Sequence, residues 1–194
     1  MSSWVDFAAA EPALAAAIRA LMCQYGPGLG YLATVRADGG PRVHPVSPVI
    51  TDDGLFCFVI KSPKRVDLDR DGRYALHSFP PEESNDEAYV SGRAQAVTDP
   101  DRVTRLAVSM RADPRVDWKL YELSVDVAML VHRDQAPVAV GGESGAARTV
   151  WRDPAGVVHD PAGAGRDSAG TGRVPPVRQR RRNGPCAAAA DSVQ

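Results

Sequence analysis

The sequence predicts a mainly β fold of the α+β class, an antiparallel barrel with a few short helices. Two turn signals, Asp38-Gly39 and Asp53-Gly54, each join consecutive strand-forming segments into a hairpin. Helical segments interrupt the strands singly, instead of alternating with them as in a parallel α/β sheet. The 194 residues, 44% of them hydrophobic, suffice for one domain with its own core.

The N-terminal segment, residues 1–28, is predicted to be helical. Ser3 can cap a short first helix, with Asp6 three residues later. Pro12 suits the first turn of a second helix, and a Gly-Pro-Gly sequence at residues 26–28 is expected to end it. Within that second helix, apolar residues recur at helical spacing: Leu14, Ile18, Leu21, Met22 and Tyr25.

The strands of the barrel are predicted at residues 29–36, 42–50, 55–61, 74–79 and 88–98. Gly92, inside the fifth of them, indicates a bulge or kink. A longer strand is predicted at Lys119–Val131, where alternate residues would share one face: Tyr121, Leu123, Val125, Val127, Met129 and Val131. Thr149–Arg152 is expected to add a last short strand.

Two short helices are predicted between these strands. Ser62 has the character of an N-cap and Pro63 that of a first helical residue, so a helix is expected there that ends at Gly72. Asp99 and Pro100 form the same kind of start, and the second helix is expected to run to about residue 110.

The composition changes sharply near residue 153, beyond which there are no aromatic residues and Gly, Ala, Pro and Arg dominate. Such a segment buries too little apolar surface to offset its ordering entropy, so residues 153–194 are predicted to be a disordered tail. The barrel domain would then occupy residues 29–152. The basic cluster "RQRRR" could touch nucleic acid or anionic lipid, but no aromatic residue or folded element accompanies it, so a solvated tail is favoured.

Charge and motifs exclude several classes of protein. The net charge of -1 gives no general attraction to nucleic acid or to a membrane surface. There is no run of 18 apolar residues and no signal-peptide pattern, so neither a transmembrane helix nor secretion is expected. The three cysteines, Cys23, Cys57 and Cys186, include no Cys-x-x-Cys pair. We therefore expect free thiols, a cytoplasmic location and no metal site.

The segment "IKSPKRVDL", residues 60–68, combines a strand end, a helix start and three cations. Free backbone N–H groups at a helix start favour an anion, whereas cations there oppose the helix dipole. A bound phosphate would explain the cations, because Lys61, Lys64 and Arg65 would neutralise it. Ser62 would donate a further hydrogen bond. In the alternative interpretation the helix is solvated, and the aspartates that follow pair with these bases: Asp67, Asp69 and Asp71.

The predicted strand 42–50 carries unusual residues for a hairpin strand. Arg42 could reach the same anion if this strand lies beside residues 55–61, or it could be an ordinary edge-strand arginine. Pro45 and Pro48 cannot donate hydrogen bonds to a neighbouring strand, so the strand must be an edge or pair on one side only. An unpaired edge leaves backbone groups available to a planar ligand.

Three stretches, "YLATVRADGGPRVHPVSPV", "GLFCFVIKSPKRVDLDRDGRYALH" and "VSGRAQAVTDP", resemble the pyridoxamine 5'-phosphate oxidase-like family, and within it the actinobacterial-type branch. The similar region covers residues 29–100, and the strand at 119–131 would complete the barrel. The resemblance implies a split β-barrel. It also implies a homodimer that binds FMN, or alternatively the deazaflavin coenzyme F-420, in two sites at the subunit interface.

The resemblance also assigns residues to the cofactor. Those along the ring and phosphate would be Arg42, Val43, His44 and Pro45, with Val59, Ile60 and Lys61 on the neighbouring strand end. Around the phosphate it places Ser62, Lys64 and Arg65. His44 could polarise a flavin carbonyl or be a hydrogen-bonded strand histidine. No side chain is identified as a catalytic proton donor.

The resemblance implies a flavin- or deazaflavin-dependent oxidoreductase that acts on a small molecule. True pyridoxamine phosphate oxidase activity is not expected, because Pro63 replaces the middle arginine of the Ser-Arg-Lys phosphate motif and the substrate-recognition segment is replaced by the tail. The alternative is a non-catalytic flavin- or haem-binding split barrel.

His77 is expected to pack inside the barrel, and Trp118 and Trp151 either stack on a ring or pack internally.

Overall fold

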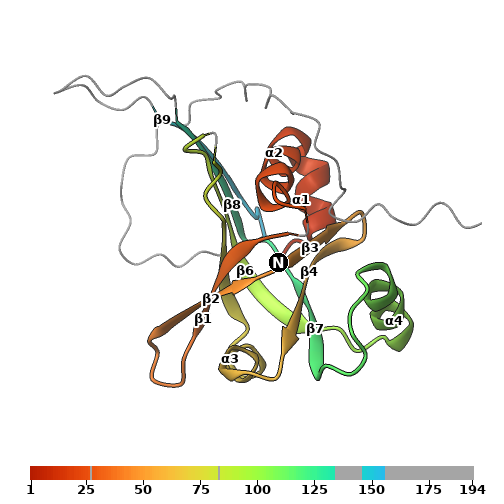
Figure 1. Cartoon of the computed structure of the whole chain (residues 1–194). Coiled ribbons are helices and arrows are strands. Elements are labelled where there is room, and N and C mark those ends of the chain that lie inside the picture. Colours follow the sequence, from red (N-terminus) through yellow and green to blue (C-terminus); the bar gives the residue numbers. More distant parts are fainter. Residues whose placement is uncertain (27, 83, 134–145, 156–194) are drawn as a thin grey trace, which may run out of the picture.

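The structure, a computed structural model, describes residues 1–26, 28–82, 84–133 and 146–155. In this part of the chain a nine-stranded antiparallel sheet curls into a split β-barrel of the α+β class, accompanied by four helices (Figure 1). The helices are α1 (Trp4–Ala10), α2 (Pro12–Met22), α3 (Pro63–Arg70) and α4 (Pro100–Ser109). The strands are β1 (Gly30–Val35), β2 (Pro41–Val46), β3 (Pro48–Thr51), β4 (Gly54–Ile60), β5 (Arg73–Ser78), β6 (Glu87–Ala96), β7 (Trp118–Leu123), β8 (Val127–Arg133) and β9 (Ala146–Arg152).

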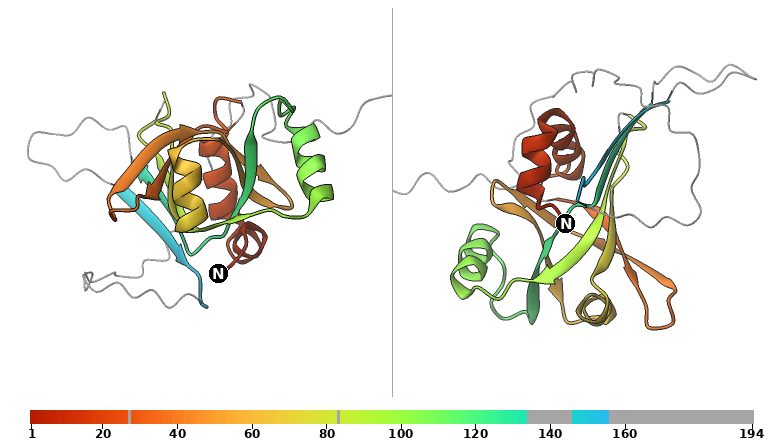
Figure 2. Two further views of the ribbon diagram at one scale, coloured as in Figure 1. Left: turned by 90° about the horizontal axis from the view of Figure 1, so that it is seen from below. Right: turned by 180° about the vertical axis from the view of Figure 1, so that it is seen from behind.

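The helices close the barrel at its two ends. Helices α1 and α2 lie at one end and α3 at the other, while α4 packs outside (Figure 2). The predicted capping box at Ser3 and Asp6 is confirmed, as is Pro12 in the first turn of α2. The main core joins α1 and α2 to the inner faces of the strands, and a second apolar cluster lies under α4: Val49, Phe56, Leu106 and Leu120.

The predicted strand 42–50 is in fact two strands, separated at Ser47. Strand β2 pairs with β1, whereas β3 pairs with β4, and β2 and β3 lie at opposite ends of the strand order β2-β1-β5-β6-β7-β4-β3. The prolines that argued for an edge, Pro45 and Pro48, flank this break. The split of the barrel therefore lies where two prolines, which have no backbone N–H, interrupt the sequence.

The prediction of one continuous strand at Lys119–Val131 is wrong. Both β7 and β8 pair with β6, but Leu123 lies opposite Ala94 and Val127 lies opposite Ser91. The β7–β8 side therefore advances four residues against three on β6, which is the one-residue excess of a β-bulge. The extra residue reverses the alternation, so Ala128 is buried whereas Val127 is only partly buried.

Near the C-terminus, the folded part of the chain is longer than the sequence predicted. Strand β9 starts three residues before the expected Thr149, and the folded part reaches Asp153, whose buried carboxylate lies 3.0 Å from the amine of Met1. The rest of the predicted tail, from residue 156, lies outside the described residues.

Cys57 is free and buried, as expected, but Cys23 is disulfide-bonded, so the expectation of free thiols is wrong for it. Among the helices described, none has the length and apolar character needed to cross a membrane.

Candidate functional site

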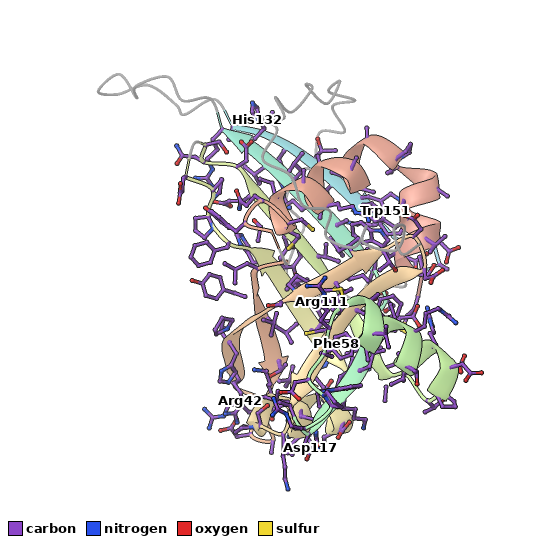
Figure 3. The ribbon with its side chains drawn as sticks, turned by 45° about the vertical axis from the view of Figure 1, so that its right-hand side comes forward. Arg42, Phe58, Arg111, Asp117, His132 and Trp151 are labelled. Carbon is purple, nitrogen blue, oxygen red and sulfur yellow. The ribbon has the colours of Figure 1, made fainter. Side chains whose placement is uncertain are left out.

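The residues predicted to bind the cofactor form two groups that meet at α3. One group, residues 42–45, lies in β2, and the other, residues 59–65, covers the end of β4 and the first turn of α3. Arg42 lies beside α3, as Figure 3 shows, and its Nε donates a hydrogen bond of 2.7 Å to Asp67 of that helix. Helix α3 thus holds β2 and the end of β4 at the same end of the barrel.

Asp67 is the centre of this junction, and its side chain is buried. It accepts hydrogen bonds from the Thr34 hydroxyl at 3.0 Å and from Arg42, and Arg70 Nη1 lies 3.6 Å from its other oxygen. Burial raises the pKa of the Asp67 carboxyl, but the hydrogen bonds from Arg42 and Thr34 and the nearby positive charges lower it further, so the net pKa lies below the ordinary value. Asp67 is therefore a carboxylate that fixes two arginines.

Strand β2 presents its predicted residues on two faces. Arg42 and His44 are half-buried and alternate with Val43 and Pro45, which are exposed. The Nε2 atom of His44 is buried and has no hydrogen-bond partner among the described residues. Leaving such an atom without a partner costs on the order of 1–3 kcal/mol, so it is a position where a ligand would be stabilised.

The backbone edges on either side of the split are unpaired within the described strands. Strand β2 pairs with β1 alone, and the last residues of β4, Phe58–Ile60, pair with β7 alone because β3 covers only Gly54–Cys57. Val59 is buried, whereas Ile60 is 51% exposed. Both edges of the split therefore carry unpaired backbone groups. Pro45 and Pro48 predict such groups, which are available to a planar ligand.

The first turn of α3 uses two of its predicted phosphate residues for internal contacts. Arg65 donates to Asp117 at 2.7 Å and so attaches α3 to the segment before β7. The Ser62 hydroxyl donates to the Ile60 carbonyl at 2.8 Å and does not cap the helix, although the helix does start at Pro63 as predicted. Ser62 can still accept a hydrogen bond from a ligand, but its proton is engaged.

The aspartates of α3 do not neutralise the cations that precede them. Asp67 binds the two arginines described above. Asp69 accepts hydrogen bonds from Lys119 and from the Tyr121 hydroxyl, each at 2.6 Å, and Asp71 forms an ion pair with Arg73. Lys61 and Lys64 form no ion pair with any residue in the described ranges. The alternative interpretation, in which these aspartates pair with the bases of the first turn, therefore fails for both lysines.

The positive charge of Lys64 acts on one buried side chain of the barrel core. Burial raises the pKa of the Cys57 thiol to about 12, and the positive charge of Lys64 acts against that rise. Cys57 belongs to the inner face of β4, so the Lys64 ammonium influences the barrel interior from the start of α3.

An open pocket of about 520 Å³ lies between α3 and the tip of the β1–β2 hairpin. Its arginines other than Arg42 escaped the sequence interpretation, although Pro63, Val66, Asp67 and Arg70 recur at the spacing of one helical face, which could have revealed Arg70. Arg36, directly after β1, stands out in the sequence as a cation beside a hairpin strand, but nothing local assigns it to a site. The lining comprises Arg36, Ala37, Asp38, Arg42, Pro63, Val66, Asp67 and Arg70.

Three other candidate residues remain, of which Trp118 lies opposite Ile60 at the end of β4. His77 was expected to pack inside the barrel, but its side chain is 41% exposed on the outer face, because Tyr74, Leu76 and Ser78 take the inner positions of β5. Trp118 contacts Phe58 edge-on and Trp151 contacts Phe7 at a tilt, and both tryptophans are partly buried. The described residues include no group of three or more His, Cys, Asp or Glu side chains that could hold a metal ion.

Comparisons with known proteins support the fold and nothing finer. No protein-family model matches the chain, and no curated protein matches it. The solved structure of Atu2129, a protein of unknown function from Agrobacterium tumefaciens, is 19% identical over 63% of this chain, with a TM-score of 0.50. A heme binding protein from Mycobacterium smegmatis is 19% identical over 69% of this chain (TM-score 0.49). HutZ, the heme storage protein from Vibrio cholerae, is 17% identical over 59% of this chain and 89% of its own (TM-score 0.43). The chain spans 57% of the length of each of the first two structures.

Proposed function

We propose that the protein is an FMN- or deazaflavin-dependent oxidoreductase of the pyridoxamine 5'-phosphate oxidase-like family, in its actinobacterial-type branch. The observation that carries the proposal is the pair Lys61 and Lys64 at the start of α3. Neither ammonium group forms an ion pair in the described part of the chain, although three aspartates follow within and just after the same helix and the charge of Lys61 contributes to the lowered pKa of Asp117. The phosphate of a cofactor would supply the missing negative charge.

The residues present fit such a group. In the proposal, Lys61, Lys64 and Arg42 neutralise the phosphate, and the Ser62 oxygen can accept a hydrogen bond only from a part of the cofactor that carries a proton. Arg65 acts on the site indirectly, because its ion pair with Asp117 fixes the first turn of α3. The sequence resemblance assigned Arg65 to the phosphate directly, and its commitment to Asp117 is our reason for this different role.

The edges of the split would hold the planar ring. The backbone of Val43 and of Ile60 offers hydrogen-bonding groups that face the open edges, Pro45 leaves its position free of an N–H donor, and His44 Nε2 offers an unpartnered buried nitrogen. When bound, a flavin or deazaflavin supplies the hydride chemistry, and the protein supplies binding, orientation and exclusion of water. No described side chain has a geometry that assigns it as a proton donor.

A second copy of the chain is the proposed partner. Six residues from six neighbouring strands lie in one row across the outer face of the sheet, and all six are at least partly exposed. None of them is Asp, Glu, Lys or Arg, which suits an interface that loses its water. The row consists of Pro45, Tyr31, His77, Tyr89, Met129 and Val150. Because it begins at β2, the same face would bring the partner next to the cofactor.

The proposal is tested by titrating the full chain with FMN and with coenzyme F-420 separately and following the fluorescence of the ligand. We expect one of them to bind at micromolar concentration. The Lys64→Ala variant should lose about 1.5–3 kcal/mol of binding free energy, as for a lost charged hydrogen bond. Arg105→Ala, which removes an exposed cation on α4, is the control and should bind as the wild type does. Absence of binding by both ligands would contradict the proposal.

A further inference from the structure

The pocket between α3 and the hairpin tip brings together three arginines from three elements. Arg36 directly follows the last residue of β1, Arg42 lies in β2 and Arg70 lies in α3. Figures 1 and 2 both show the tip of the β1–β2 hairpin beside α3. Only two carboxylates, Asp38 and Asp67, line the pocket with them. The lining therefore carries three positive and two negative charges, an excess of one positive charge.

Two of the guanidinium groups keep donors available. Arg42 uses its Nε for Asp67, and no described residue accepts from either of its Nη atoms. Arg36 uses Nη2 for Asp38 at 2.7 Å, and its Nε and Nη1 have no partner in the described ranges. Arg70 donates through Nη2 to the Val35 carbonyl, and its Nη1 lies 3.6 Å from Asp67, so these two contacts orient its guanidinium group. Both arginines of the hairpin therefore keep N–H donors that no described residue accepts from.

Asp67 and Arg70 prepare the pocket for a ligand. Asp67 is buried and ionised, so it holds Arg42 in place, and the contact of Arg70 with Val35 ties the end of β1 to α3. A guanidinium that is already fixed loses less conformational entropy when a ligand binds. The first residue of α3, Pro63, also lines the pocket, so the positive end of the helix dipole adds to the field there.

We infer that this pocket binds a phosphate group, with Arg36 and Arg42 as direct ligands and Asp67 and Arg70 as positioning residues. Forked N–H donors from two sides suit the tetrahedral oxygens of a phosphate, which accept in pairs. The excess positive charge and the helix terminus balance its negative charge. The phosphate could be that of the cofactor or that of a separate phosphate-bearing molecule. Because the proposed function also assigns Arg42 to the cofactor phosphate, the inference rests on the proposed function if the phosphate is that of the cofactor, and stands without it if a separate molecule provides the phosphate.

The test uses inorganic phosphate as the probe and isothermal titration calorimetry of the full chain. Arg36→Gln is the decisive variant, because Arg36 pairs only with Asp38 at the exposed hairpin tip and its loss leaves the core intact. We expect phosphate to bind about tenfold more weakly or worse to this variant. Arg105→Gln removes the same charge from exposed α4 and should leave the affinity unchanged. Equal affinity in the two variants, or no phosphate binding by the wild type, overturns the inference.

Two further titrations identify the source of the phosphate. If the cofactor provides it, Arg36→Gln weakens FMN binding but not riboflavin binding, because riboflavin lacks the phosphate. If a separate molecule provides it, protein saturated with FMN still binds inorganic phosphate, and Arg36→Gln weakens that binding. Both results support the pocket. Failure of the oxidoreductase proposal is recognised separately, by the absence of FMN and F-420 binding while phosphate still binds.

Discussion

Asp67 combines burial, a negative charge and contacts to three elements. Its carboxylate joins β1 through Thr34, β2 through Arg42 and its own helix through Arg70. A carboxylate in this position must stay ionised, because protonation removes its attraction to both arginines. Its lowered pKa shows that the hydrogen bonds and charges more than offset the cost of burial.

We expect Asp67→Asn to lower the free energy of unfolding by about 2 kcal/mol at pH 7, because two arginines lose a buried anionic partner. The folded-state pKa of Asp67 lies below its unfolded value, so its contribution to stability is present above about pH 5 and is lost as the pH falls through the folded pKa. Urea denaturation at pH 7 and pH 3 measures this, and the difference between wild type and variant should shrink at pH 3. Asp52→Asn, at a fully exposed carboxylate, is the control.

Most of the candidate site follows from residue types in the sequence, but the pairing of its charges does not. The spacing around Ser62 and Pro63 predicts a helix start with cations, and the helix begins there. Among these cations, Arg65 forms an ion pair with Asp117, which lies more than 50 residues away, and nothing in the sequence near Arg65 indicates that partner. Long-range ion pairs of this kind are fixed by the barrel that brings β7 next to α3.

At the scale of the elements, the junction of β7 and β8 depends on Gly92. Every second residue from Tyr121 to Val131 is apolar, which predicts a single strand, but all five residues from Val127 to Val131 are apolar, so the alternation is lost where β8 begins. The bulge arises because both strands follow one edge of β6, and at Gly92 the carbonyl oxygen of Ser124 comes so close that a Cβ would lie 2.1 Å from it. Only glycine allows this approach, and Gly92 was indeed the residue that predicted an irregularity.

We expect Gly92→Ala to lower the free energy of unfolding by about 1–3 kcal/mol, because the strands must move apart to admit the methyl group. Thermal and urea denaturation followed by circular dichroism measure the change. Gly40→Ala is the matched control, since its Cβ would meet only the end of the exposed Asp38 side chain, at 3.1 Å. Equal stability of the two variants would show that the contact with Ser124 is easily relieved.

At the scale of the whole molecule, the outer sheet face is the surface that most needs an explanation. Tyr31 and Val150 remain 37% exposed, and the row they belong to crosses β2, β1, β5, β6, β8 and β9. Exposed apolar side chains are ordinary when they are scattered, but a contiguous row on a sheet is typical of an interaction surface.

We expect the wild type to be a dimer by size-exclusion chromatography with light scattering, and Tyr89→Arg to be a monomer, because a charge in the centre of the row would be buried without a partner. Val108→Arg introduces the same charge at a residue of α4 that is 72% exposed, and this variant should remain a dimer. A dimer that persists in Tyr89→Arg would place the interface elsewhere.

The pairing of β6 with three other strands also determines how the chain reaches this structure. Strand β6 bonds to β5 along one edge and to β7 and β8 along the other, and each of these pairings closes a loop of the chain. Contacts between distant segments slow folding, because the entropy of loop closure must be lost first. The amides of β6 should therefore exchange with deuterium only when the whole domain opens, later than those of α4 at the periphery. Native-state hydrogen exchange would show β6 as the last element to lose protection.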